Sequence, residues 1–118
     1  MFIRYFIKIK MNIFKIITFL LLLFAINWSS ANEIIVTSTA NNGAGSFRQA
    51  VSGAMPNDTI IINVKGTINL TAQIDFLQSN ITVIGPYPKH NTFTPNGAFD
   101  MFNFNAVNNI KFVGLGFV

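Results

Sequence analysis

The sequence contains no cysteine, one histidine and four acidic residues among its 118 residues. Without cysteine the chain has neither disulfide bonds nor thiolate ligands, so packing and backbone hydrogen bonding must hold it together. The single histidine and the scattered carboxylates form no group with the spacing of metal ligands. We therefore predict no metal or other cofactor, and we identify no catalytic, cofactor-binding or metal-binding residue.

The net charge of +4 comes from the first segment of the chain, because residues 1–31 contain four basic side chains and no acid. Nucleic-acid binding requires basic residues that cluster on the folded part of a protein. The sequence predicts no such cluster, so nucleic acid is excluded as a partner. Beyond Ala31 the charges cancel, with Arg48, Lys65, Lys89 and Lys111 against Glu33, Asp58, Asp75 and Asp100.

The first segment is typical of a signal peptide. Basic residues between Arg4 and Lys15 precede an apolar run at residues 16–26. Small residues at Ser29 and Ala31 then suit cleavage after Ala31. The apolar run is also short for a helix that spans a membrane. We therefore predict a signal peptide over residues 1–31.

Cleavage there predicts Asn32 as the mature N-terminus. Translation starts at Met1 or at Met11, since the segment from Met11 alone keeps a basic residue, the apolar run and the cleavage site. The alternative is a retained membrane anchor in which residues 2–7 join the apolar run. Lysines interrupt that longer stretch at high cost in lipid, so cleavage is the favoured interpretation.

The mature segment begins with a strand and a short helix. Residues 33–38 are rich in β-branched side chains, which predicts a strand. After a glycine-rich turn, Ser46 and Gln49 have the spacing of a capping box. The helix ends at residues 56–58. Its apolar face holds Phe47, Ala50, Val51 and Ala54.

After Asp58 the apolar period becomes two, which indicates strands. Residues 80–85 and 109–114 share Asn, Ile and Gly at matched positions. A weaker echo matches apolar phase only, setting Ile60 and Ile62 against Ile81 and Val83 and against Phe102 and Phe104. Repeats of about 20–30 residues suit a solenoid, although a β-sandwich could also produce two echoes.

Residues 35–51 and four later motifs carry a resemblance to a known family. The motifs are Asp58-Thr59-Ile60, Gly66-Thr67-Ile68, residues 82–86 and residues 109–117. In this order they resemble the opening of large secreted bacterial proteins with the pectin-lyase-like fold. The resemblance implies an all-β chain, a right-handed parallel β-helix with a short N-terminal capping helix. Phe47 and Val51 depart conservatively from the family's usual Leu and Ile.

The resemblance divides the chain into three parts: a signal peptide at residues 1–31, an N-terminal cap at residues 32–57, and the first coils of a truncated β-helix at residues 58–118. The cap would shut the near end of the solenoid, because exposed core side chains and strand edges need cover. We expect its helix to lie over Ile60, Ile62 and Val64. We also expect the open far end to self-associate.

Five side chains invite a chemical interpretation. His90 lies in a loop and is read as solvated. Asp58, Asp75 and Asp100 could serve as carboxylates of a glycosidase. We instead interpret Asp58 as the cap of a turn, and Asp75 and Asp100 as residues that mark the starts of strands. Arg48 could bind an acidic ligand, and its simpler role is to pair with a nearby acid or cover the cap edge. Residues 43–46 resemble a phosphate-binding turn but lack its lysine.

The resemblance implies an adhesin-like protein that is secreted or held at the bacterial cell surface, and the lack of a catalytic group of residues in the sequence favours a non-catalytic one. Surface glycans or host and extracellular proteins are its implied partners, and membrane contact occurs only through the leader during export. The enzyme alternative is the N-terminal part of a polysaccharide lyase or glycoside hydrolase with the same fold. A third possibility is a small self-contained β-domain.

Overall fold

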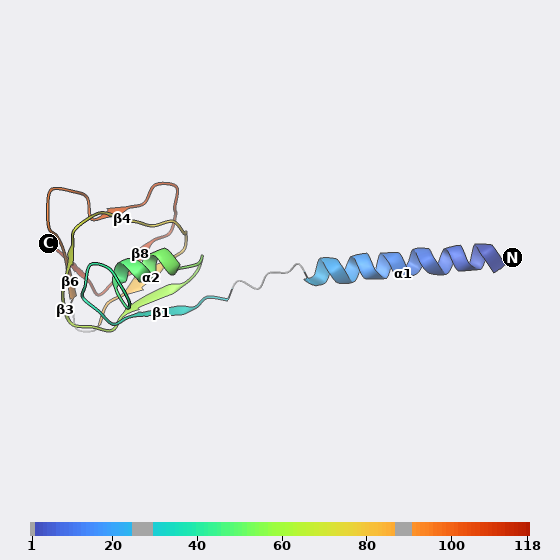
Figure 1. Cartoon of the computed structure of the whole chain (residues 1–118), viewed down its shortest axis with the longest axis horizontal. Coiled ribbons are helices and arrows are strands. Elements are labelled where there is room, and N and C mark those ends of the chain that lie inside the picture. The colour runs from blue at the N-terminus through green and yellow to red at the C-terminus, as the bar shows by residue number, and fades with distance from the viewer. Residues whose placement is uncertain (1, 25–29, 87–90) are drawn as a thin grey trace.

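A computed structural model describes residues 2–24, 30–86 and 91–118 (Figure 1). Two helices lie in these ranges, α1 at Phe2–Phe24 and α2 at Phe47–Gly53. The strands described are β1 Glu33–Val36, β2 Thr59–Ile62, β3 Gly66–Leu70, β4 Ile74–Asp75, β5 Thr82–Ile84, β6 Asn91–Pro95, β7 Phe102–Asn103, β8 Lys111–Val113 and β9 Gly116–Phe117.

All strand pairs in the described residues are parallel. They form three sheets, in the orders β1-β2-β5-β8, β3-β6-β9 and β4-β7. From β2 onward the chain visits these sheets in the same order in each turn, so every strand stacks on the strand one coil earlier. This is a parallel β-solenoid with an N-terminal helix, as the sequence predicted, and not a β-sandwich.

The stronger sequence echo is confirmed as a structural repeat. β5 pairs with β8 so that Val83 lies against Phe112 and Ile84 against Val113. This register places Asn80 beside Asn109, 29 residues further on, and the two side-chain amides are hydrogen bonded at 2.9 Å. The shared Asn and Gly therefore occupy the same two corners of successive coils.

The weaker echo is wrong in its register. Ile60 pairs with Val83, not with Ile81. Phe102 pairs with Ile74 in a different sheet altogether. Alternating apolar residues look the same after any shift of two positions, so apolar phase alone cannot fix which strand lies over which.

The core runs inside the coils, where alternate residues of each strand point inward. Most of the expected core positions are confirmed. Val64 is only partly buried, and Phe104 remains 42% exposed. The buried apolar side chains include Ile60, Ile62, Ile68, Leu70, Ile74, Phe76, Ile81, Val83 and Phe93.

Helix α2 begins where the sequence predicted. The Ser46 hydroxyl accepts a hydrogen bond from the backbone N–H of Gln49 at 3.2 Å. The Gln49 side chain accepts from Gly45, one residue before the position a capping box would use. The apolar face of α2 is buried against β1, β2 and β4. Phe47 reaches further than expected, because its ring lies 4.8 Å from that of Phe93.

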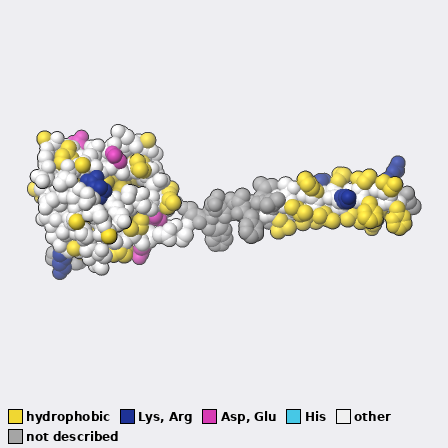
Figure 2. Space-filling model, viewed as in Figure 1, with side chains coloured by type: hydrophobic (Ala, Val, Ile, Leu, Met, Phe, Trp, Pro, Cys, Tyr) yellow, Lys and Arg dark blue, Asp and Glu magenta, His cyan; other side chains and the backbone are white. Residues whose placement is uncertain are grey.

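Helix α1 lies apart from the solenoid (Figure 1) and has no contact with any other described element. Hydrophobic side chains line much of the face shown in Figure 2, interrupted by a few basic ones. Neither described helix combines the length and apolar character needed to cross a membrane. The predicted cleavage region lies partly outside the described residues, at 25–29, and the signal peptide stays a prediction.

Candidate functional site

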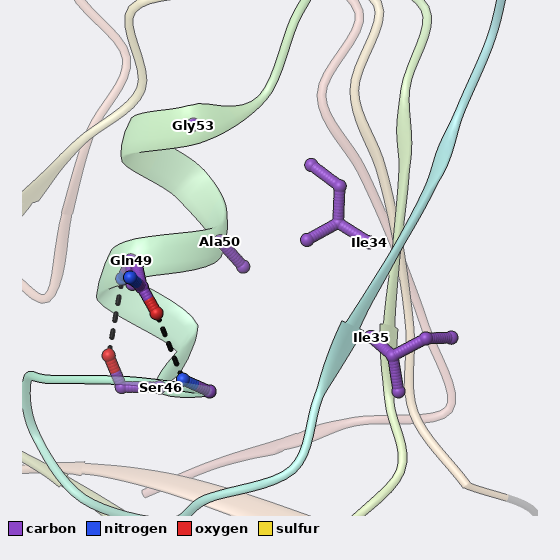
Figure 3. A pocket seen from close by; sticks show the side chains of 7 residues that line it. Ile34, Ile35, Ser46, Gln49, Ala50 and Gly53 are labelled. Atoms are coloured by element: carbon purple, nitrogen blue, oxygen red, sulfur yellow. Dashed lines mark hydrogen bonds between the residues drawn. The ribbon is translucent and has the colours of Figure 1, made fainter.

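The pocket between β1 and α2 has a volume of about 310 Å³ (Figure 3). Ile34 and Ile35 form its strand side, and Ala50 and Gly53 form part of its helix side. Figure 3 shows the hydrogen bonds at the start of α2, in which the Gln49 N–H donates to Ser46 Oγ and the Gly45 N–H donates to Gln49 Oε1. The polar groups at this end are therefore used by the helix cap.

Those hydrogen bonds also argue against a phosphate-binding role for residues 43–46. A phosphate-binding turn needs backbone N–H groups that point freely at the ligand. Here the Gly45 N–H donates to Gln49 Oε1 at 2.9 Å, and the Ser46 N–H donates to the Gly43 carbonyl at 3.2 Å. The Gln49 N–H is held by Ser46 Oγ. The N–H groups of Gly45 and Ser46 are therefore used within the turn and the helix cap, and neither is free to point at a phosphate.

The Arg48 side chain links α2 to the turn after β3 through hydrogen bonds. Its Nη1 donates to the Gln73 carbonyl at 2.8 Å, and its Nη2 donates to the Ala72 carbonyl at 2.6 Å. Nε and Nη2 also donate to the backbone and side-chain oxygens of Asn41. Of the two simpler roles expected for Arg48, pairing with an acid is not found among the described residues, where its hydrogen-bond partners are carbonyl oxygens, and the alternative of covering the edge of the helix region agrees with these contacts. Arg48 therefore ties α2 to residues 41, 72 and 73, and its guanidinium has little remaining capacity to bind a ligand.

The three aspartates have separate roles. Asp58 is 2% exposed and accepts from the backbone N–H of Met55 at 2.8 Å, which agrees with the turn-cap interpretation. Asp75 is exposed on β4 and accepts from the Asn103 amide of the next coil at 2.8 Å. Asp100 is exposed before β7. No hydrogen bond in the described residues joins any two of them, and His90 lies outside those residues.

A second groove, of about 380 Å³, lies on the outside of the coil corner before β5 and β8. Asn80 and Asn109 have left-handed backbone conformations, with φ of 62° and 57°. Asparagine tolerates this region better than most residues. Their side chains form the amide ladder, and Thr82 lies beside Lys111 in the register of the strands. The lining residues are Asn80, Thr82, Asn109, Ile110 and Lys111.

This corner groove presents hydrogen-bonding groups at regular spacing. The ladder bond uses Asn80 Oδ1 and one Asn109 N–H. Asn80 and Asn109 are both exposed, and the groove that they line is also lined by the partly buried Thr82 and the exposed Lys111. Stacked strands place such groups about 4.8 Å apart. This arrangement can hold a ligand rich in hydroxyl groups, with Lys111 adding one positive charge.

The corner groove was not predicted from the sequence, although the echo between residues 80–85 and 109–114 contained part of the signal. Comparison of the chain with protein-family models, with curated proteins and with solved structures gives no match. Function is therefore inferred from the chain's own residues and geometry.

Proposed function

We propose that this chain is an exported, non-catalytic, adhesin-like β-solenoid of the right-handed pectin-lyase-like kind, which acts outside the cell or at the bacterial cell surface. Its corner groove binds surface polysaccharides. The observation that carries this proposal is the amide ladder of Asn80 and Asn109, continued by Thr82 and Lys111 along one outer corner.

Export is supported by the difference in sequence and contacts between the predicted signal peptide, residues 1–31, and the solenoid. The leader combines basic residues with an apolar run, and α1 makes no contact with the other described elements. Asn32 is held on both sides: its carbonyl accepts from the Thr59 N–H at 2.8 Å, and its N–H donates to Asp58 at 2.9 Å. Among the described residues around the predicted cleavage site, the residue after the cut is thus the first that is hydrogen bonded into the solenoid.

The first prediction is that a bacterial host exports the full chain and removes residues 1–31. Cell fractionation and intact mass should find the product outside the cytoplasm with Asn32 at its N-terminus. Leu20→Asp, within the apolar run, should block export because a charge disrupts the apolar core of a signal peptide. Ile3→Asp, outside that run, is the matched control and should leave export intact. Exported protein that retains the leader would contradict the cleavage.

The groove suits polysaccharides because sugars offer many hydroxyl groups and few apolar surfaces. An open groove that follows stacked strands can contact several sugar units in succession. The Lys111 ammonium favours acidic sugars over neutral ones, since it is exposed and gains a charge-assisted hydrogen bond with a carboxylate. A polyuronate and a neutral glucan are therefore suitable probes.

The second prediction concerns the amide ladder. Replacing both Asn80 and Asn109 with Gly removes the amides while keeping a residue that tolerates positive φ. We expect the exported protein to lose about tenfold in affinity for immobilised polyuronate, since each hydrogen bond contributes about 0.5–1.5 kcal/mol. Biolayer interferometry against both probes measures this effect.

Asn69→Gly is the control, because Asn69 is exposed on β3, in another sheet. It should bind polyuronate as the unaltered protein does. Equal binding by the double variant, at unchanged melting temperature, would contradict the groove as the site. Cleavage of the polysaccharide would instead support the lyase or hydrolase alternative.

A further inference from the structure

Asp58 lies at a junction of three segments. Its Oδ1 accepts from the Asn32 N–H at 2.9 Å, and its Oδ2 accepts from the Met55 N–H at 2.8 Å. Its carbonyl accepts from the Thr82 N–H at 3.2 Å. One residue therefore connects the start of β1, the chain after α2, and the second coil.

Among the residues that the structure describes, no cation accompanies the buried Asp58 carboxylate. It is 2% exposed, and within residues 2–24, 30–86 and 91–118 its side-chain partners are neutral backbone amides. A buried carboxylate is costly unless it is paired with a positive charge or fully hydrogen bonded. In the uncleaved chain, the described residues supply the second form of compensation, as two backbone N–H donors.

We propose that cleavage after Ala31 turns the Asn32–Asp58 hydrogen bond into an ion pair that locks the cap onto the first coil. This inference rests on the cleavage position in the proposed function. Hydrolysis breaks the peptide bond between Ala31 and Asn32. Water supplies the oxygen of the new Ala31 carboxylate, and the Asn32 nitrogen takes up protons to become an ammonium. An ordinary α-amino group has a pKa of about 7.7–8.0, so the new terminus is charged at neutral pH.

The geometry for this ion pair exists before cleavage. The Asn32 nitrogen already lies 2.9 Å from Asp58 Oδ1, inside the range of a charge-assisted hydrogen bond. The bond from Thr59 to the Asn32 carbonyl keeps that residue in register with β2. The ammonium therefore needs no rearrangement to meet its partner, and the third segment at the junction, after α2, is fixed through Met55.

The position of the cut is decisive. An extended chain advances about 3.3 Å per residue, so a cut two residues earlier places the ammonium beyond reach of Asp58. The Asn32 N–H then remains a neutral amide. Cleavage after Ala31 thus differs from nearby cuts in its effect on the folded protein.

The test uses the full chain with the recognition sequence of a site-specific protease in place of residues 28–31, so that the cut leaves Asn32 at the new N-terminus. Melting temperature is measured before and after the cut. The control carries the same sequence two positions earlier, and its cut leaves Ser30 at the N-terminus. Both cuts release the leader, and only the first places an ammonium beside Asp58.

We expect the first cut to raise the melting temperature by about 5–15 °C more than the control cut, given the strength of hydrogen bonds to charged groups in a domain of this size. The same advantage should disappear in Asp58→Asn, where the amide oxygen still accepts but carries no charge. It should persist in Glu33→Gln, which removes an exposed acid next to Asn32.

Equal melting temperatures after the two cuts would overturn the proposal. This comparison keeps Asp58 intact, so it holds even where Asp58→Asn fails to fold. It is also independent of export: a chain that is never exported contradicts the proposed function, whereas equal stability of the two products contradicts only the ion pair.

Discussion

Phe47→Asp is expected to unfold the solenoid at room temperature or to leave it barely stable. Phe47 is fully buried, and its ring lies within 6.4 Å of the rings of Phe76, Phe93 and Phe102. Loss of a buried phenylalanine ring costs about 3–5 kcal/mol, and an unpaired carboxylate in its place adds to that loss. The total rivals the whole stability of a small domain. Circular dichroism during urea and thermal unfolding measures it.

Two further substitutions separate the role of Phe47 from a general effect on α2. Phe47→Leu keeps an apolar side chain and should cost roughly 1–2 kcal/mol. Ser52→Lys places a charge on the exposed face of the same helix, in its last turn where a cation is tolerated, and should change stability by less than about 0.5 kcal/mol. A thermal transition unchanged by Phe47→Asp would show that α2 does not cover the solenoid core.

The parallel solenoid was predicted from the resemblance of residues 35–51 and the later motifs to a β-helix family, because the internal echoes alone also allowed a β-sandwich. The echo that proved correct marks corners of the coils. Asn80 and Asn109 occupy left-handed positions, and Gly85 and Gly114 end the strands of successive coils. Few residue types suit such positions, so their recurrence carries information about register that alternating apolar residues lack. This is why the echo with Asn and Gly was confirmed and the purely apolar echo was wrong.

The partners of Arg48 could not be predicted from the sequence. Its hydrogen bonds reach carbonyl oxygens of residues 72 and 73, in a turn 24 and 25 residues away. Every residue has a backbone carbonyl, so composition does not show which of them will face a guanidinium. An acid is the partner of an arginine that a sequence makes visible, which is why an acidic partner was one of the two simpler roles expected for Arg48.

The corner groove needed one more piece of information than the echo supplied. Alignment of residues 80–85 with 109–114 places Asn over Asn, but it does not show which way the side chains turn. The left-handed conformation of both residues accompanies an arrangement in which one amide donates to the other on the outside of the corner. The Asp58 junction was hidden for a similar reason, because Asn32 and Asp58 are 26 residues apart and meet only once β1 lies on β2.

Gly85→Ala is expected to destabilise the solenoid by about 2–3 kcal/mol, because two coils meet too closely at this corner for a side chain. A Cβ added to Gly85 would lie 2.5 Å from the Gly114 carbonyl oxygen and 2.6 Å from Leu115 Cδ2. The Gly85 N–H donates to the Val113 carbonyl at 2.8 Å, so the backbone cannot retreat without losing that bond.

Gly53→Ala is the matched control for this change, and we expect the opposite sign. A Cβ at Gly53 meets no atom within 4 Å, and the residue closes α2, where alanine is favoured over glycine by up to about 1 kcal/mol. Urea unfolding of both variants under the same conditions gives the two free energies directly. If Gly85→Ala were as stable as Gly53→Ala, the coils would not be in contact at Gly85 and Gly114, and the register of β5 on β8 would have to be shifted.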